Sequence, residues 1–240
     1  RRSVLGVLWS VLNPLLMNIV MVAVFSTLFA AMRGQGITNF PVYLIIGQLL
    51  FTFFNDATSS AMSSMLGAAP LIKKVYIPKY IFPLEKVCFA LVNCVFSFVA
   101  LMIFTGAPLH PTVLLALYPL LTLFLFSLGV GLVLATLTVF FRDIMHLWSV
   151  FTTMLMYFSA IFYDPSQMGS LVVYGFSINM SRFIKFNPLY WYITAFRTAV
   201  LDGEMLSWNM LWICGACAVI TLVFGLLVFR KQQDKFVLHI

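Results

Sequence analysis

Long stretches without a single charged side chain are the feature that most limits how this sequence can fold. Residues 3–32, 87–141, 144–163 and 205–229 contain no Asp, Glu, Lys or Arg. About 20 consecutive apolar residues are enough to cross a bilayer as a helix. Only 9% of the chain is charged and 62% is hydrophobic, whereas soluble domains carry about 25% charge. The sequence therefore predicts an all-α membrane protein and excludes a soluble enzyme.

Polar breaks divide the chain into six predicted transmembrane helices within a single domain, residues 1–240. Asn13-Pro14 separates the first span from residues 1–12, because a residue before proline avoids the helical region. Residues 1–12 are too short to cross, so we expect an interface helix there. Since the sequence opens on Arg1 rather than methionine, we expect native residues before it. The predicted spans are residues 14–32, 41–63, 84–105, 112–140, 144–163 and 205–229.

The region between the fifth and sixth spans, residues 165–203, is too interrupted to cross. Arg182, Lys185 and Asn187-Pro188 break it into short apolar pieces. We expect two short helices that meet at Asn187-Pro188 and dip into the outer leaflet as a re-entrant pair. The alternative is an ordinary amphipathic hairpin on the membrane surface.

The basic residues predict the orientation. With six spans, ten of the 14 Lys and Arg residues fall on the side of the two termini. Cytoplasmic loops of membrane proteins are enriched in Lys and Arg, so both termini are predicted to be cytoplasmic. We therefore attribute the excess of basic residues to membrane orientation and to contact with anionic lipid headgroups. We do not expect nucleic acid as a partner. Asp56 is the one acid that lies clearly inside a span, since Glu85 is at the start of its own; a structural role for Asp56 is favoured over ion coupling.

The sequence lacks residues for energy conversion or catalysis. It has no G-x-x-x-x-G-K-[ST] motif for ATP phosphates. His110, His146 and His239 lie in separate segments, and the Cys214/Cys217 pair sits in an apolar run, where packing is the better interpretation. We therefore expect no catalytic residue, no metal site and no cofactor in this chain.

Four segments, in order, resemble ABC-transporter permeases that export O-antigen, capsule and teichoic acid polymers. They are RRSVLGVLWSVLNPLL (residues 1–16), LIKKVYIPKYIFPL (71–84), FFRDIMHL (140–147) and FNPLYWYITAFRTAVLDG (186–203). One departure is Ala160, where that family often has proline; its absence predicts a straighter outer end for the fifth span. The resemblance covers nearly the whole chain.

The resemblance implies a transport subunit rather than an enzyme. It implies a homodimer in the bacterial inner membrane that moves lipid-linked glycan outward, with two cytoplasmic ATPase subunits that bind ATP and Mg. The alternatives are a permease of the same architecture for a drug or lipid, a membrane enzyme of polyprenyl-linked glycan synthesis, and a proton-coupled transporter. The identity of the polymer, its chain length and its end-cap recognition are not encoded in recognisable motifs.

The resemblance also implies site residues. Prolines at 70 and 78 bracket apolar and basic side chains in a way that suits a small helix seated in a partner's groove, although an ordinary inside-positive loop also explains the lysines. The predicted ATPase-coupling residues are Leu71, Ile72, Lys73, Lys74, Val75, Tyr76 and Pro78, with Arg142 and Asp143 as a second contact or, equally, an ion pair closing a turn.

Substrate contacts are expected from aromatic and basic side chains. The conduit candidates are Phe25, Phe29, Trp148, Phe151, Tyr157 and Phe158, with ordinary packing as the alternative for each. Arg1 and Arg2 are the candidates for a lipid pyrophosphate, because guanidinium matches phosphate geometry; headgroup anchoring is the alternative. The predicted outer gate is Asn187, Pro188 and Arg197. Gly131 and Ala135, four residues apart, are expected to allow close helix contact.

Overall fold

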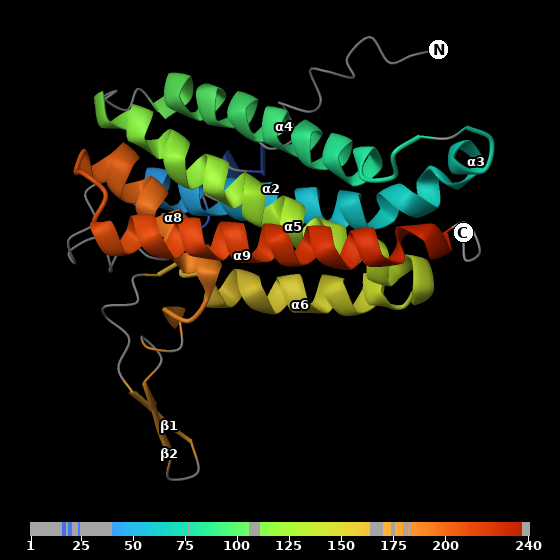
Figure 1. Cartoon of the computed structure of the whole chain (residues 1–240). Helices are drawn as coiled ribbons and strands as arrows, with labels where there is room; N and C mark the ends of the chain where they lie inside the picture. The colour runs from blue at the N-terminus through green and yellow to red at the C-terminus, as the bar shows by residue number, and fades with distance from the viewer. Residues whose placement is uncertain are drawn as a thin grey trace.

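Helices make up most of this chain in the computed structural model (Figure 1). The structure describes residues 40–75, 77–105, 111–163, 170–173, 176–179 and 184–236, with isolated positions 16, 17, 19, 20, 24 and 182. The helices and strands, in chain order, are α2 Phe40–Gly67, α3 Ala69–Ile72, α4 Ile81–Thr105, η2 Pro111–Ala116, α5 Leu117–Phe140, α6 Ile144–Phe158, β1 Ser170–Val173, β2 Phe176–Asn179, α8 Pro188–Arg197, η4 Thr198–Asp202, α9 Trp208–Gln232 and η5 Gln233–Lys235.

Among the described residues, four helices are long and apolar enough to cross a membrane. They are Phe40–Gly67, Ile81–Ile103, Pro111–Phe140 and Trp208–Lys235. They overlap the second, third, fourth and sixth spans expected from the sequence. For these four, the expectation of a helix long and apolar enough to cross a membrane is confirmed.

The remaining two predicted spans, residues 144–163 and 14–32, are not matched by a described helix long enough to cross a membrane. Helix α6 covers 15 residues, about 22 Å at 1.5 Å per residue, which is shorter than a hydrocarbon core of about 30 Å. The predicted span 14–32 and the interface helix 1–12 lie outside the described residues, apart from five helical positions between 16 and 24. The six-span topology stays a prediction.

The long helices run side by side (Figure 1). Helix α2 packs against both α4 and α5, and α5 packs against α9. In its most apolar window α2 is 67% buried, whereas α9 is 17% buried, so α2 is the central helix and α9 lies at the periphery. Helix α3 and the end of α9 lie at one end of the bundle, and α8 lies at the other (Figure 1).

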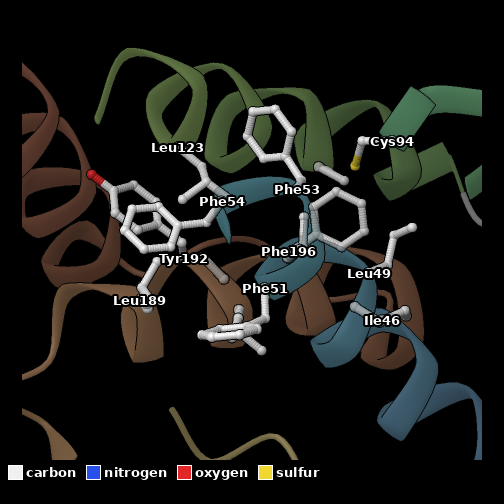
Figure 2. Close-up of a cluster of buried hydrophobic side chains, with 14 of the residues drawn as sticks. Ile46, Leu49, Phe51, Phe53, Phe54, Cys94, Leu123, Leu189, Tyr192 and Phe196 are labelled. Carbon is white, nitrogen blue, oxygen red and sulfur yellow. The ribbon is translucent and has the colours of Figure 1, made fainter. Parts of the chain in front are cut away.

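The main core forms where α2, α5 and α8 meet (Figure 2). The ring of Phe54 stacks on Phe126 with centroids 5.7 Å apart, and Phe126 contacts the ring of Tyr192 at 5.5 Å. The hydroxyl of the buried Tyr192 donates to the carbonyl of Cys214 at 2.9 Å. This bond satisfies a polar group inside the core and joins α8 to α9.

Glycines bring two helix pairs into backbone contact. A Cβ at Gly129 would lie 2.5 Å from the carbonyl carbon and oxygen of Thr221, and a Cβ at Gly225 would collide with the carbonyl of Gly129. Gly131 faces Ala61, where the two Cβ positions would be 2.9 Å apart. The expected small-residue contact at Gly131 is therefore present between α2 and α5, and a closer one, which the sequence did not single out, joins α5 to α9.

Part of the expectation for residues 165–203 is wrong. Where the first of two short helices was expected, β1 and β2 pair as an antiparallel hairpin, with Ser170 opposite Asn179 and Val173 opposite Phe176. Val172 and Val173 favour an extended backbone, and a two-residue connection ending in glycine is typical of a hairpin. The second short helix exists as α8, and Asn187 caps it. The described chain is thus helical apart from this hairpin.

Candidate functional site

The predicted coupling segment starts in a short helix, α3, at one end of the bundle (Figure 1) and continues as a turn, so the helix expected between Pro70 and Pro78 ends early, at Ile72. Helix α3 has Pro70 in its first turn. A turn at Lys73 and Lys74 follows it. Leu71 is 44% exposed and Val75 is 50% exposed. Lys73, Lys74 and Pro78 are also exposed, and Tyr76 lies outside the described residues. The segment presents apolar and basic side chains together at its surface.

Ile72 differs from its neighbours because it packs inward. It contacts a second buried cluster, which we call the inner cluster, where α2, α5 and α9 end. The inner cluster consists of Met65, Leu132, Ala135, Val139, Phe229 and Phe236. Ile72 therefore anchors α3 to the bundle, while Leu71 and Val75 form the outward surface.

The residues that directly follow α9, namely η5 and Phe236, pack in the same region. Phe236 is fully buried in the inner cluster, between Phe140 and Phe229. The Lys79 ammonium donates to the carbonyl of Gln233 and lies 5.9 Å from the centre of the Phe236 ring. The residues after α9 thus join the loop after α3 to the ends of α5 and α9.

The second predicted contact, Arg142 and Asp143, lies in the turn between α5 and α6. Both side chains are exposed. The turn is closed by main-chain hydrogen bonds, from the N–H groups of Met145 and His146 to the carbonyls of Arg142 and Asp143 at 3.2 and 3.1 Å. The turn therefore has main-chain bonds to close it, and in the described part of the chain no ion pair joins these two side chains; the second contact stays a prediction.

At the opposite end, Arg197 is buried although it carries a charge. Its side chain is 5% exposed. Its Nε and Nη2 atoms donate to the carbonyl of Tyr43 at 3.2 and 2.9 Å, Nη1 donates to Ala160 at 2.9 Å and Nη2 to Ile161 at 3.1 Å. Gly47 makes room, because a Cβ there would collide with Nη2. Arg197 joins α8 to the start of α2 and the end of α6.

The charge of Arg197 also affects the pKa of Asp202, in the segment that follows α8. Burial raises the pKa of Asp202, the nearby Glu204 raises it further, and Arg197 opposes both effects. Arg182 and Lys185, two other basic residues expected on this side, are exposed. Arg197 is therefore distinguished from them by its burial.

Asn187 holds the other end of α8 to the same part of α6. Its Oδ1 accepts from the N–H of Leu189 at 3.0 Å, which caps the helix, and Pro188 follows in the first helical turn. Its Nδ2 donates to the carbonyl of Phe158 at 3.2 Å and to Ser159 Oγ at 2.9 Å. Two of the predicted gate residues, Asn187 and Arg197, thus contact the same segment, residues 158–161, which consists of the last residue of α6 and the three that follow it.

That segment does not continue as a helix. Helix α6 ends at Phe158, and Ala160 has a φ of 52°, a backbone conformation that alanine seldom adopts. The expectation of a straighter outer end at Ala160 is therefore wrong. The hydrogen bonds from Asn187 and Arg197 to the chain on both sides of Ala160 stabilise the turn.

The described aromatic conduit candidates differ in their surroundings. Trp148 donates to Thr58 Oγ1 at 3.2 Å and packs on Phe54 with centroids 6.1 Å apart, so it joins α6 to α2. Phe151 is 48% exposed and Tyr157 is 59% exposed, while Phe158 is half-buried. Phe25, Phe29, Arg1 and Arg2 lie outside the described residues.

A polar pocket between α2 and α6 was not foreseen from the sequence. We call it the α2–α6 pocket; its volume is about 200 Å³ and its lining residues are Gln48, Phe51, Thr52, Asn55, Thr152, Thr153 and Met156. The sequence signal was present: Gln48, Thr52 and Asn55 are spaced four and three residues apart, which places them on one face of a helix. Within the described ranges, no three His, Cys, Asp or Glu side chains gather to hold a metal.

Comparisons with known proteins agree with this architecture. The family model described as ABC-2 type transporter matches residues 1–201. The chain is 27% identical to an O-antigen export system permease protein RfbA of Klebsiella pneumoniae and 27% identical to that of Myxococcus xanthus, each over 98% of this chain and 88% of the relative. It is 22% identical to the capsule polysaccharide export inner-membrane protein CtrC of Neisseria meningitidis, over 96% of this chain and 84% of the relative. The chain belongs to the ABC-2 type transporter family.

Proposed function

We propose that this chain is the membrane subunit of an ATP-driven exporter that moves lipid-linked polysaccharide outward across a bacterial inner membrane. The observation that carries the proposal is its similarity, over nearly its whole length, to permeases named for O-antigen and capsule polysaccharide export. The sequence has no phosphate-binding loop for ATP. ATP and Mg would therefore be bound by a separate ATPase subunit.

The proposed assembly contains two copies of this chain and two ATPase subunits. A second copy is expected because the family resemblance implies a conduit enclosed by a homodimer. The exposed apolar and aromatic side chains of α6, among them Phe151, Met154 and Tyr157, supply a surface for that contact or for the substrate. Both termini are proposed to be cytoplasmic, in accord with the basic residues near them.

We place the ATPase against α3. Leu71 and Val75 offer apolar contacts, and Lys73 and Lys74 surround them with positive charge. An apolar centre with a charged rim is the common composition of a specific protein interface. The same end of the bundle carries the exposed turn at Arg142 and Asp143, which would form the second contact.

The contacts of α3 indicate how movement of an ATPase would reach the membrane helices. Ile72 is seated on the inner cluster, which includes residues of α2, α5 and α9. Arg142 and Asp143 lie directly before α6. A displacement of the ATPase would therefore act on the inner ends of α2 and α5 through Ile72, and on α6 through the turn.

The outer end would respond through α8. Because Asn187 and Arg197 both hold the chain that follows α6, an axial shift of α6 would pull on both ends of α8. Tyr43 at the start of α2 is held by the same guanidinium. This arrangement supports the proposal that Asn187, Pro188 and Arg197 belong to an outer gate.

The docking surface is tested by removing its apolar contacts without changing its charge. In a chain carrying Leu71→Gln and Val75→Gln, we expect the ATPase recovered with the purified permease to fall more than tenfold, because each buried aliphatic side chain contributes about 1.5–3 kcal/mol. The ATPase is recognised in the native host's membranes by ATP hydrolysis and its phosphate-binding motif. The matched control is Phe186→Gln, an exposed residue next to α8. Equal recovery with all three chains would contradict the docking surface.

A further inference from the structure

The α2–α6 pocket gathers polar side chains from two helices at one place between them. Gln48, Thr52 and Asn55 lie within α2, where Leu49, Phe51, Phe53 and Phe54 are interleaved with them. A polar group in the interior of a membrane protein costs free energy unless it is hydrogen-bonded or faces a wet cavity. The pocket therefore requires a partner for these groups.

Some of the donor hydrogens of the pocket are already used within the helices. Thr152 and Thr153 donate to the carbonyls of Trp148 and Ser149 at 3.0 and 2.9 Å, and Gln48 Nε2 donates to Thr52 Oγ1 at 3.4 Å. The Oε1 atom of Gln48 is buried and has no hydrogen-bond partner. The pocket thus offers an unpaired acceptor at Gln48 Oε1 beside the side-chain amide of Asn55, and its missing partner is a group that donates to the first and accepts from the second.

The apolar part of the lining suits a flat ring. Phe51 lies on the side of α2 away from Phe53, and Figure 2 shows the two rings on opposite sides of the helix. Phe51 and Met156 supply apolar surface beside the acceptors. A combination of apolar walls and a few placed polar groups is typical of small-molecule sites.

The volume of the pocket and the absence of charged residues in its lining further limit the class of ligand it can hold. Its volume of about 200 Å³ is below the roughly 300–1,000 Å³ of pockets that hold drug-sized ligands, so it accommodates one ring rather than an oligosaccharide. Its described lining has no Lys, Arg, Asp or Glu. A group with several hydroxyl donors and no charge fits these constraints, whereas a lipid chain would leave the acceptors unpaired.

We propose that the α2–α6 pocket binds one neutral sugar ring of the glycan, whose hydroxyl groups donate to Gln48 Oε1 and to the threonine hydroxyl oxygens. This inference rests on the proposed function, and it adds a sugar subsite between α2 and α6. Neither the aromatic candidates nor the predicted gate includes its polar residues.

The test measures sugar binding to the purified complex of permease and ATPase in detergent. The probe is the neutral trisaccharide mannotriose, and saturation-transfer NMR reports its contact with the protein. Gln48→Met keeps the length of the side chain but removes the acceptor, and Thr153→Val keeps the shape but removes the hydroxyl. The control is Thr136→Val, because Thr136 is buried on α5, bonds to its own helix at 2.8 Å and is remote from the pocket lining.

We expect each pocket variant to bind mannotriose roughly three- to tenfold more weakly, the effect of one hydrogen bond, and the control to bind it as the unsubstituted chain does. Equal binding by all four chains, or no binding by the unsubstituted chain, would overturn the subsite and indicate that the pocket holds only water. A preference for a glycerol phosphate trimer over mannotriose would also overturn it. If the ATPase does not associate with the unsubstituted chain, the proposed function fails instead.

Discussion

The guanidinium carbon of Arg197 lies 3.4 Å from the centre of the Tyr43 ring. The same guanidinium donates to the main chain of Tyr43, Ala160 and Ile161. A planar cation that stacks on a ring and donates in its own plane uses both properties by which arginine differs from lysine. Arg197 thus joins three segments that are far apart in the sequence.

Replacing Arg197 by lysine is predicted to destabilise the protein. A lysine keeps the charge but cannot reach three carbonyl oxygens in one plane, so at least one buried acceptor loses its partner, at a cost of about 1–3 kcal/mol. Thermal unfolding in detergent measures the effect, with Arg182→Lys at an exposed position as control. Equal melting temperatures for the two variants would contradict the assigned role.

Asn187 allows its two contacts to be separated. Asn187→Asp keeps the acceptor that caps α8 but loses the Nδ2 donor to Ser159 and Phe158, whereas Asn187→Ala loses both. Loss of an N-cap costs about 0.5–2 kcal/mol, so the alanine variant is predicted to be the less stable of the two. Thermal unfolding of both variants tests this order, and the reverse order would mean that repulsion between the introduced carboxylate and the Phe158 carbonyl outweighs the cap.

The close backbone contact between α5 and α9 predicts that a change of glycine to alanine is destabilising at Gly225, whereas the same change is tolerated at Gly67, which lies outside this contact. Gly225→Ala places a methyl group against the Gly129 carbonyl, while Gly67→Ala meets no atom within 4 Å. We expect the first to destabilise by about 1–3 kcal/mol through overpacking, and the second to be neutral or slightly stabilising. Unfolding in detergent with denaturant measures both; a stable Gly225→Ala chain would show that α9 is able to shift outward freely.

Phe236 is predicted to hold the docking segment in place. Phe236→Ala empties the centre of the inner cluster, and large-to-small changes of a buried Phe cost about 3–5 kcal/mol. Because Ile72 and Lys79 contact this region, we expect faster hydrogen exchange at residues 68–75 and 77–80. Phe224→Ala, an exposed residue of the same helix as Phe229, is the control, and unchanged exchange in the Phe236 variant would separate the C-terminal segment from α3.

Local patterns predicted the helices but not the contacts that join them. Uncharged runs and prolines placed α2, α4, α5 and α9 within a few residues, because crossing a membrane requires length and apolarity that are visible in a single segment. The cap at Asn187 was also readable, since an Asn-Pro pair before an apolar run is a local signal.

The sequence could not show which segments meet in space. Gly129 and Gly225 are far apart along the chain, and each alone is an ordinary glycine in an apolar helix. Arg197 was expected near the outer surface, but its burial depends on three carbonyl groups from α2 and the end of α6. The hairpin at residues 170–179 was missed because short apolar segments fit a strand and a helix equally well until β-branching is weighed.

Reconstitution of transport tests the central claim, that this chain forms the membrane path and depends on a separate ATPase for energy. Lipid-linked O-polysaccharide is incorporated into proteoliposomes with the permease alone or with its ATPase, and its appearance on the opposite leaflet is followed with a lectin. We predict translocation only with the ATPase and hydrolysable ATP. Translocation by the permease alone, or an ATPase-containing complex that moves no glycan, would contradict the account.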